Sequence, residues 1–152
     1  MKAAEYYKSH TGFFDIAANL SDDRFKGKYH HKQSHEADFD QVIARANEFG
    51  VKKFLFAAGY IQDAVESYSL ALRDENFYAT VGIHPCRALE PFVSIGKRAA
   101  IEHASPEVKQ KCLDDYIAKI DNLLSNQEKP KFVAVGECGL DYDRLEYASK
   151  EE

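Results

Sequence analysis

The chain has 152 residues, and its 25 acidic and 20 basic side chains give a formal net charge of −5. With 45% hydrophobic and 30% charged residues, the composition excludes a disordered chain, and the acidic balance excludes nucleic-acid binding by bulk positive charge. No apolar run approaches the roughly 20 residues of a membrane helix, so no membrane partner is expected. Three widely spaced cysteines predict reduced thiols in an intracellular compartment, cytoplasmic or nuclear.

Short apolar runs that predict β-strands alternate with amphipathic stretches along the chain. The first run, Phe13–Ala18, predicts a buried strand that contains one acid, Asp15. Such an acid is costly unless it is paired, liganded or hydrogen-bonded to the backbone. Further strands are expected over residues 51–58, 77–83 and 131–136.

Three helices are expected between these strands. Ser34 is placed as the N-cap of the first helix, and Gly50 ends it. Asp63 is placed at the start of the second helix, where a glutamate three residues later completes a spacing like that of a capping box. Residues 87–104 are predicted to form a loop with helical pieces. Ser105, followed by proline, then marks the start of a long third helix.

The order β-α-β-α-β-α-β predicts a parallel sheet with right-handed crossovers. Two architectures fit, an open α/β sheet or the first half of a (β/α)₈ barrel. A complete barrel needs about 250 residues, which is more than this chain has. In both architectures functional groups lie just past the carboxyl ends of the strands. The polar residues at these places are Asp15, Asn19, His84, Glu137 and Asp141.

A carboxylate and an imidazole at neighbouring strand ends, such as Glu137 and His84, suit a divalent metal, Mg²⁺, Mn²⁺ or Zn²⁺. Structural alternatives stay open, because an acid after a strand is often a turn residue and a histidine beside proline often belongs to a turn. The basic stretch from Lys28 to His35 fits either a phosphate contact or a solvated loop. No glycine-rich fingerprint or Walker loop is present in the sequence, so no nucleotide cofactor is predicted.

Several of these segments resemble the TatD family of metal-dependent deoxyribonucleases, within the amidohydrolase-like barrels. They are residues 14–20, 50–54, 80–85 and 135–144, the last (VGECGLDYDR) being the most specific. The resemblance implies an α/β fold of the (β/α)₈ TIM-barrel type, of which residues 1–152 supply about the first four βα units. It implies a single TatD-like hydrolase domain, truncated before the C-terminal half of the barrel.

The resemblance also implies function. It implies hydrolysis of phosphodiester bonds in DNA, as a 3′-to-5′ exonuclease that uses a divalent metal, with Mg²⁺ first and Mn²⁺ or Zn²⁺ as alternatives. By position, Glu137 matches the metal-ligating glutamate after strand four, and His84 matches the His-Pro turn and is carried over as a pocket residue. Many members have D-x-H-x-H after strand one, whereas here Ala17 and Asn19 take the histidine positions, as in a branch with D-x-x-x-N.

Asp15, Asn19 and Asp141 are the other expected pocket residues, and no catalytic residue is assigned. The family's remaining metal ligands, two histidines and an aspartate, lie on the second half of the barrel. Three functions therefore stay open. One is a nuclease, and another is a non-catalytic product that binds or pairs with a complementing half. The third is a metal hydrolase with a non-nucleic substrate. A half-barrel leaves two open sheet edges, so self-association is expected.

Overall fold

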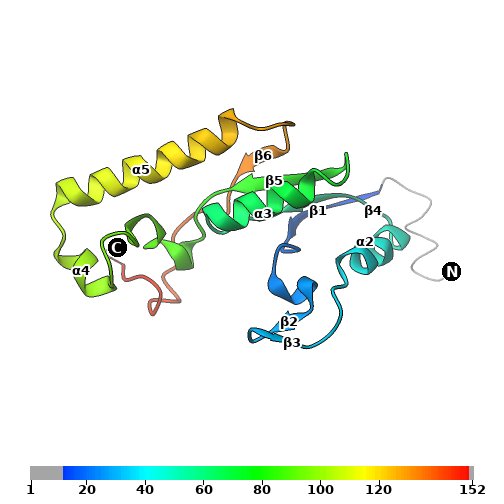
Figure 1. Cartoon of the computed structure of the whole chain (residues 1–152), viewed down its shortest axis with the longest axis horizontal. Helices are drawn as coiled ribbons and strands as arrows, with labels where there is room; N and C mark the ends of the chain where they lie inside the picture. The colour runs from blue at the N-terminus through cyan, green and yellow to red at the C-terminus, as the bar shows by residue number, and fades with distance from the viewer. Residues whose placement is uncertain (1–11, 151–152) are drawn as a thin grey trace.

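The computed structural model describes residues 12–150. Four parallel strands form one sheet in the order β1-β4-β5-β6, which is also their order along the chain. Figure 1 shows this sheet with the small antiparallel ribbon of β2 and β3 beyond one end of β1. The strands are β1 Phe13–Ala18, β2 Lys28–Tyr29, β3 Lys32–Gln33, β4 Val51–Phe56, β5 Phe77–Val81 and β6 Phe132–Val135.

A helix lies in each connection between neighbouring strands of the sheet, as the sequence predicts. The helices are α2 Phe39–Glu48, α3 Ile61–Ala71, α4 Arg98–His103 and α5 Pro106–Ser125, with 3₁₀ turns η1 Asp23–Lys26, η2 Pro85–Arg87 and η3 Glu90–Phe92. The short pieces η3 and α4 fall within residues 87–104, so the prediction of a loop with helical pieces is confirmed. No helix within residues 12–150 has the length and apolar character needed to cross a membrane.

One predicted helix start is confirmed and two are wrong. The Ser105 hydroxyl accepts the N–H of Val108 and caps α5. Ser34 does not cap α2, which begins five residues later, because its hydroxyl donates to the carbonyl of Lys32 beside the β2–β3 ribbon. Asp63 does not precede α3 but lies in its first turn, where its carboxylate binds groups outside the helix.

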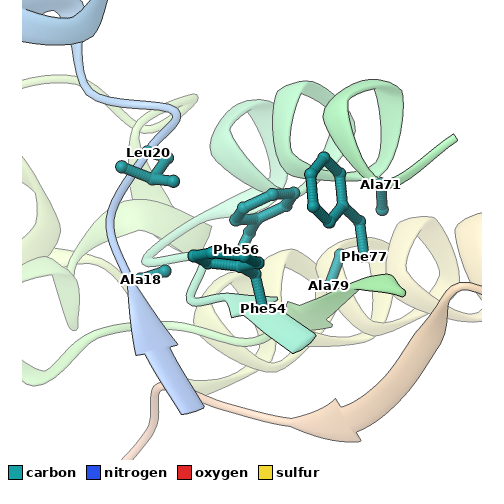
Figure 2. Close-up of a cluster of buried hydrophobic side chains, with 7 residues drawn as sticks. All are labelled: Ala18, Leu20, Phe54, Phe56, Ala71, Phe77 and Ala79. Atoms are coloured by element: carbon teal, nitrogen blue, oxygen red, sulfur yellow. The ribbon is translucent and has the colours of Figure 1, made fainter. Parts of the chain in front are cut away.

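The hydrophobic core lies between the helices and one face of the sheet. Alternate residues of β4 and β5 point to the helices, and Phe77 makes edge contacts with Phe54 and Phe56 at ring-centroid distances of 5.5 and 5.3 Å. A second group, around Val81, packs against α5. Figure 2 shows the main cluster, which comprises Ala18, Leu20, Phe54, Phe56, Ala71, Phe77 and Ala79.

The opposite face of the sheet carries no helix within residues 12–150, and we call it the open face. The large side chains that lie there include Phe14 and Tyr78, whose rings are 6.1 Å apart, and Val135, which is 75% exposed. β1 therefore has the predicted bounds but not the predicted burial: Ile16 is 66% exposed. The physical reason is that β1 is an edge strand and nothing in the described part of the chain covers this face.

Candidate functional site

Backbone hydrogen bonds draw together the segments that follow β4, β5 and β6. The N–H of His84 donates to the carbonyl of Gly59, and the N–H of Glu137 donates to the carbonyl of Ala58, each at 2.9 Å. Because Ala58 follows β4 and Glu137 follows β6, the second bond passes over the end of β5. Residue 82, just past β5, is glycine, and a Cβ there would collide with the carbonyl oxygen of Glu137. The close approach therefore requires glycine at this position.

A cavity of about 400 Å³ opens beside these tied segments. Three of the five residues expected from the sequence line it together, namely Asn19, His84 and Glu137. They come from the ends of β1, β5 and β6, so residues far apart in sequence meet where the strands end. This is the place at which α/β folds gather functional groups.

The other two expected residues do not line the cavity. Asp15 is exposed, and its carboxylate accepts the N–H of Ala17 at 3.1 Å. Asp141 accepts the N–H groups of Asp143 and Arg144 at 2.9 and 3.2 Å, which holds the pKa of its carboxyl below the usual range. In the described residues both acids therefore bind local backbone, as in ordinary turns.

The carboxylate of Glu137 is the open acceptor of the site. It makes no hydrogen bond or ion pair with any residue of the described range 12–150, although its backbone N–H is fixed. Its neighbours in the cavity are different: Asp63 accepts the Ser21 hydroxyl at 2.6 Å and the Gly59 N–H at 2.8 Å. Glu137 is thus held by its backbone with its side chain free for an external cation or donor.

Sequence reasoning missed the charged residues that connecting segments bring to the cavity. Lys26 of η1 binds Glu66 at 2.6 Å and Asp23 at 3.2 Å, and the hydrogen bond to Glu66 raises the pKa of Lys26. Arg87, at the end of η2, also lines the cavity. No sequence signal marks Lys26, whereas Arg87 follows His84 by three residues in the same turn and could have been found from that spacing.

A divalent metal needs several protein ligands in fixed geometry. Within residues 12–150 no group of three or more His, Cys, Asp or Glu side chains is arranged to hold one. The described residues therefore do not by themselves fit a catalytic metal, and no chemical step through a metal is assigned to them.

Known proteins resemble the chain over most of its length. The model of the family described as TatD related DNase matches residues 14–152. A deoxyribonuclease Tat-D of Schizosaccharomyces pombe is 40% identical over 139 residues, which cover 90% of this chain and 39% of that protein. A 3′-5′ ssDNA/RNA exonuclease TatD of Salmonella typhimurium is 32% identical over 131 residues, covering 86% and 37%.

Two solved structures of related proteins also resemble the chain. An uncharacterized amidohydrolase from Saccharomyces cerevisiae superimposes with a TM-score of 0.75 at 30% identity, covering 93% of this chain and 41% of that one. A TatD family hydrolase from Entamoeba histolytica gives a TM-score of 0.66, also at 30% identity, covering 93% and 42%. The chain thus spans about two fifths of the length of the proteins it matches.

The parallel sheet, its helices and the polar cavity at its carboxyl edge define an α/β fold of the TIM-barrel type, of which this chain covers part. Within that class, the chain belongs to the TatD related DNase family. The resemblance carried by residues 135–144 and by the three shorter segments is confirmed.

Proposed function

We propose that this chain supplies part of a nuclease-type site that hydrolyses phosphodiester bonds in nucleic acid, with DNA cut from its 3′ end. Membership of the TatD related DNase family supports the reaction class, and the names of relatives support the substrate and direction. In this chain the proposal depends on one observation: the Glu137 carboxylate stands free in a polar cavity while its backbone is tied to the end of β4.

Glu137 is the residue through which we expect a divalent metal, Mg²⁺ first, to be held. A carboxylate is a ligand that Mg²⁺ prefers, and the metal would polarise a phosphoryl oxygen when bound. The further ligands must come from outside the described residues, since these hold no complete set. We therefore expect the chain on its own to degrade DNA negligibly.

A chimera tests the proposal. Residues 14–150 replace the matching segment of the Schizosaccharomyces pombe relative, and release of nucleotides from single-stranded DNA labelled at either end is followed with Mg²⁺, Mn²⁺ or Zn²⁺. We expect metal-dependent degradation from the 3′ end. Glu137→Gln should lower the rate about 100-fold or more, since losing a ligand removes several kcal/mol of transition-state stabilisation.

Glu128→Gln is the matched control, because Glu128 is exposed and lies before β6, away from the cavity. A folded chimera that binds metal but leaves DNA intact would contradict the proposal. Degradation that survives Glu137→Gln would contradict the role of this residue. Hydrolysis of a small ester in place of DNA would support the alternative of a non-nucleic substrate.

A second candidate function is pairing with a complementing half, and the open face favours it. Val133 and Val135 on this face are 53% and 75% exposed, and both sheet edges, β1 and β6, lack a neighbouring strand within residues 12–150. Exposed parallel strands with apolar side chains favour association. We expect the purified chain to self-associate, as light scattering after size-exclusion chromatography would show.

The test of pairing uses a lysine on the open face. Val135→Lys should shift the purified chain toward monomer, because a charge at this place opposes burial of the face. Val93→Lys is the control, since Val93 is 64% exposed but follows η3, away from the sheet. A chain that is monomeric before any substitution would exclude self-association through this face.

A further inference from the structure

Two side chains of the cavity, those of Arg87 and His84, carry N–H donors that make no hydrogen bond within residues 12–150. The guanidinium of Arg87 lies 3.9 Å from the centroid of the Tyr60 ring and 3.7 Å from the Glu90 carboxylate. The stacking and the ion pair hold the guanidinium in place. Neither contact is a hydrogen bond, because the ring offers no oxygen acceptor and the ion pair, at 3.7 Å, is too long. All five guanidinium N–H donors therefore lack a hydrogen-bond acceptor within residues 12–150.

Hydrogen bonds also fix the position of His84. Its backbone N–H binds the Gly59 carbonyl at 2.9 Å, and its Nδ1 accepts the N–H of Cys86 at 3.0 Å. Because Nδ1 acts as acceptor, the neutral ring carries its proton on Nε2. Nε2 then donates a hydrogen bond and has no lone pair for a metal. Residues 12–150 supply no acceptor for it, and His84 lines the same cavity as Arg87.

Glu90 forms an ion pair with Arg87 at 3.7 Å, whereas the acids that line the cavity make no hydrogen bond or ion pair with Arg87 or His84 within residues 12–150. Asp23 and Glu66 bind Lys26, and Asp63 binds Ser21 and the backbone of Gly59. Asp22 binds Arg24, and the Glu137 carboxylate contacts neither donor within residues 12–150. The hydrogen-bond donors of Arg87 and His84 are therefore available to an external acceptor. An Arg fork with a neighbouring N–H matches a phosphate group, whose oxygens accept several charge-assisted hydrogen bonds.

We propose that Arg87 and the Nε2–H of His84 bind the phosphate group of a nucleotide in this cavity. The inference rests on the proposed function, because it names how the same site holds its substrate. Both residues are positioning residues, since they hold a phosphate and exchange no proton with it in this account. Lys26 takes no part, because Asp23 and Glu66 already occupy its ammonium group.

Calorimetric binding of thymidine 5′-monophosphate to the full chain tests the inference, with inorganic phosphate and thymidine as the other two ligands. EDTA is present throughout, so that no metal contributes. We expect the monophosphate to bind, inorganic phosphate to compete with it, and thymidine to bind at least about 10-fold more weakly, equivalent to about 1.4 kcal/mol. Thymidine binding as tightly as the monophosphate, or a monophosphate that does not bind, would overturn the inference.

Variants locate the contact. Arg87→Ala should weaken the monophosphate about 10-fold, and Arg87→Lys should recover part of the loss, because lysine keeps the charge without the fork. His84→Phe should weaken binding, whereas His84→Gln, which keeps a donor near the place of Nε2, should weaken it less. Arg45→Ala is the matched control, because Arg45 is an exposed arginine of α2 that lines no part of this cavity. Equal affinities of Arg87→Ala and the unsubstituted chain would overturn the assignment.

One measurement needs no substitution in the chain under test. In the unsubstituted chain labelled with ¹³C-histidine, the monophosphate should shift the ring signal of His84 and leave those of His30 and His31, on the exposed β2–β3 turn, in place. The inference and the proposed function can fail separately. If the chimera degrades DNA while Arg87→Ala binds the monophosphate normally, only the inference fails. If Arg87 governs binding while the chimera is inactive, only the proposed function fails.

Discussion

The two faces of the four-stranded sheet are made by neighbouring residues of the same strands, yet they lie in different surroundings. On the covered face Phe56 is fully buried under the helices, whereas on the open face Val135 is 75% exposed. Both faces carry apolar residues, which is the pattern of strands buried on two sides in parallel sheets. The comparison teaches that the same apolar strand pattern is buried by helices on one face of residues 12–150 and left exposed on the other.

The largest loss of stability should come from removing a buried side chain on the covered face. Phe56→Ala removes a ring that contacts Phe39 and Phe77, and we expect a loss of about 3–5 kcal/mol in the free energy of unfolding. Val135→Ala on the open face should change it by less than about 0.5 kcal/mol. Urea denaturation followed by circular dichroism measures both. Similar losses for the two variants would show that the open face is buried in the chain under study.

A pair of lysines sharpens the same contrast. Lys131 is 7% exposed, and its ammonium donates to the carbonyls of Asp74, Glu75 and Phe77, between α3 and the start of β5. Lys131→Met should cost about 2 kcal/mol, because these hydrogen bonds involve a charged donor and three carbonyl acceptors lose their partner. Lys53→Met, on the open face, should cost less than about 0.5 kcal/mol. Thermal unfolding of the two variants side by side is the measurement.

Removal of the hydroxyl group should change the free energy of unfolding in opposite directions at Ser67 and Thr80. The Ser67 hydroxyl on α3 is buried and has no partner in the described chain, so Ser67→Ala should raise the free energy of unfolding by about 1 kcal/mol. Thr80 accepts the N–H of Ala58 at 2.9 Å, so Thr80→Val should lower it by about 1 kcal/mol. Chemical denaturation of both variants checks the signs. A loss of stability in Ser67→Ala would mean that its hydroxyl has an unseen partner such as water.

The smallest effect lies outside both faces, at Asp141. Hydrogen bonds from Asp143 and Arg144 hold the pKa of the Asp141 carboxyl below its usual range. Because this pKa is lower in the folded than in the unfolded chain, its contribution to stability is present above about pH 4 and is lost as the pH falls through the lower folded value. Asp141→Asn should be slightly less stable at neutral pH, and the difference should vanish in acid. A difference that persists in strong acid would point to lost packing.

The fold could be predicted where the signal is local. The bounds of β1 and the start of α5 at Ser105 depend on nearby residues, and both are confirmed. The starts of α2 and α3 differ from the prediction because the side chains of Ser34 and Asp63 bind partners outside the helix ends, namely Lys32 and Ser21. The burial of β1 could not be predicted, because the pattern of a strand does not say which of its faces is covered.

The cavity could be predicted in part. Strand ends place Asn19, His84 and Glu137 near one another by topology, and the structure brings them into one cavity. The availability of Arg87 depends on its stacking on Tyr60, a contact across 27 positions of the chain that no local spacing encodes. Asp15 and Asp141 are acids of the kind found in functional sites, but their carboxylates accept hydrogen bonds from nearby backbone N–H groups, as in turns.

The hydrogen bond from Glu137 to Ala58, passing over Gly82, has a consequence for exchange with solvent. The amides of Gly136 and Glu137 follow the last strand and have no regular ladder, yet each donates to a carbonyl at the end of another strand at 2.9 Å. Such amides exchange only when those strand ends separate, so their protection should match that of β4 and β5 and exceed that of the exposed residues after 141. We therefore expect the cavity wall that carries Glu137 to open as slowly as the sheet.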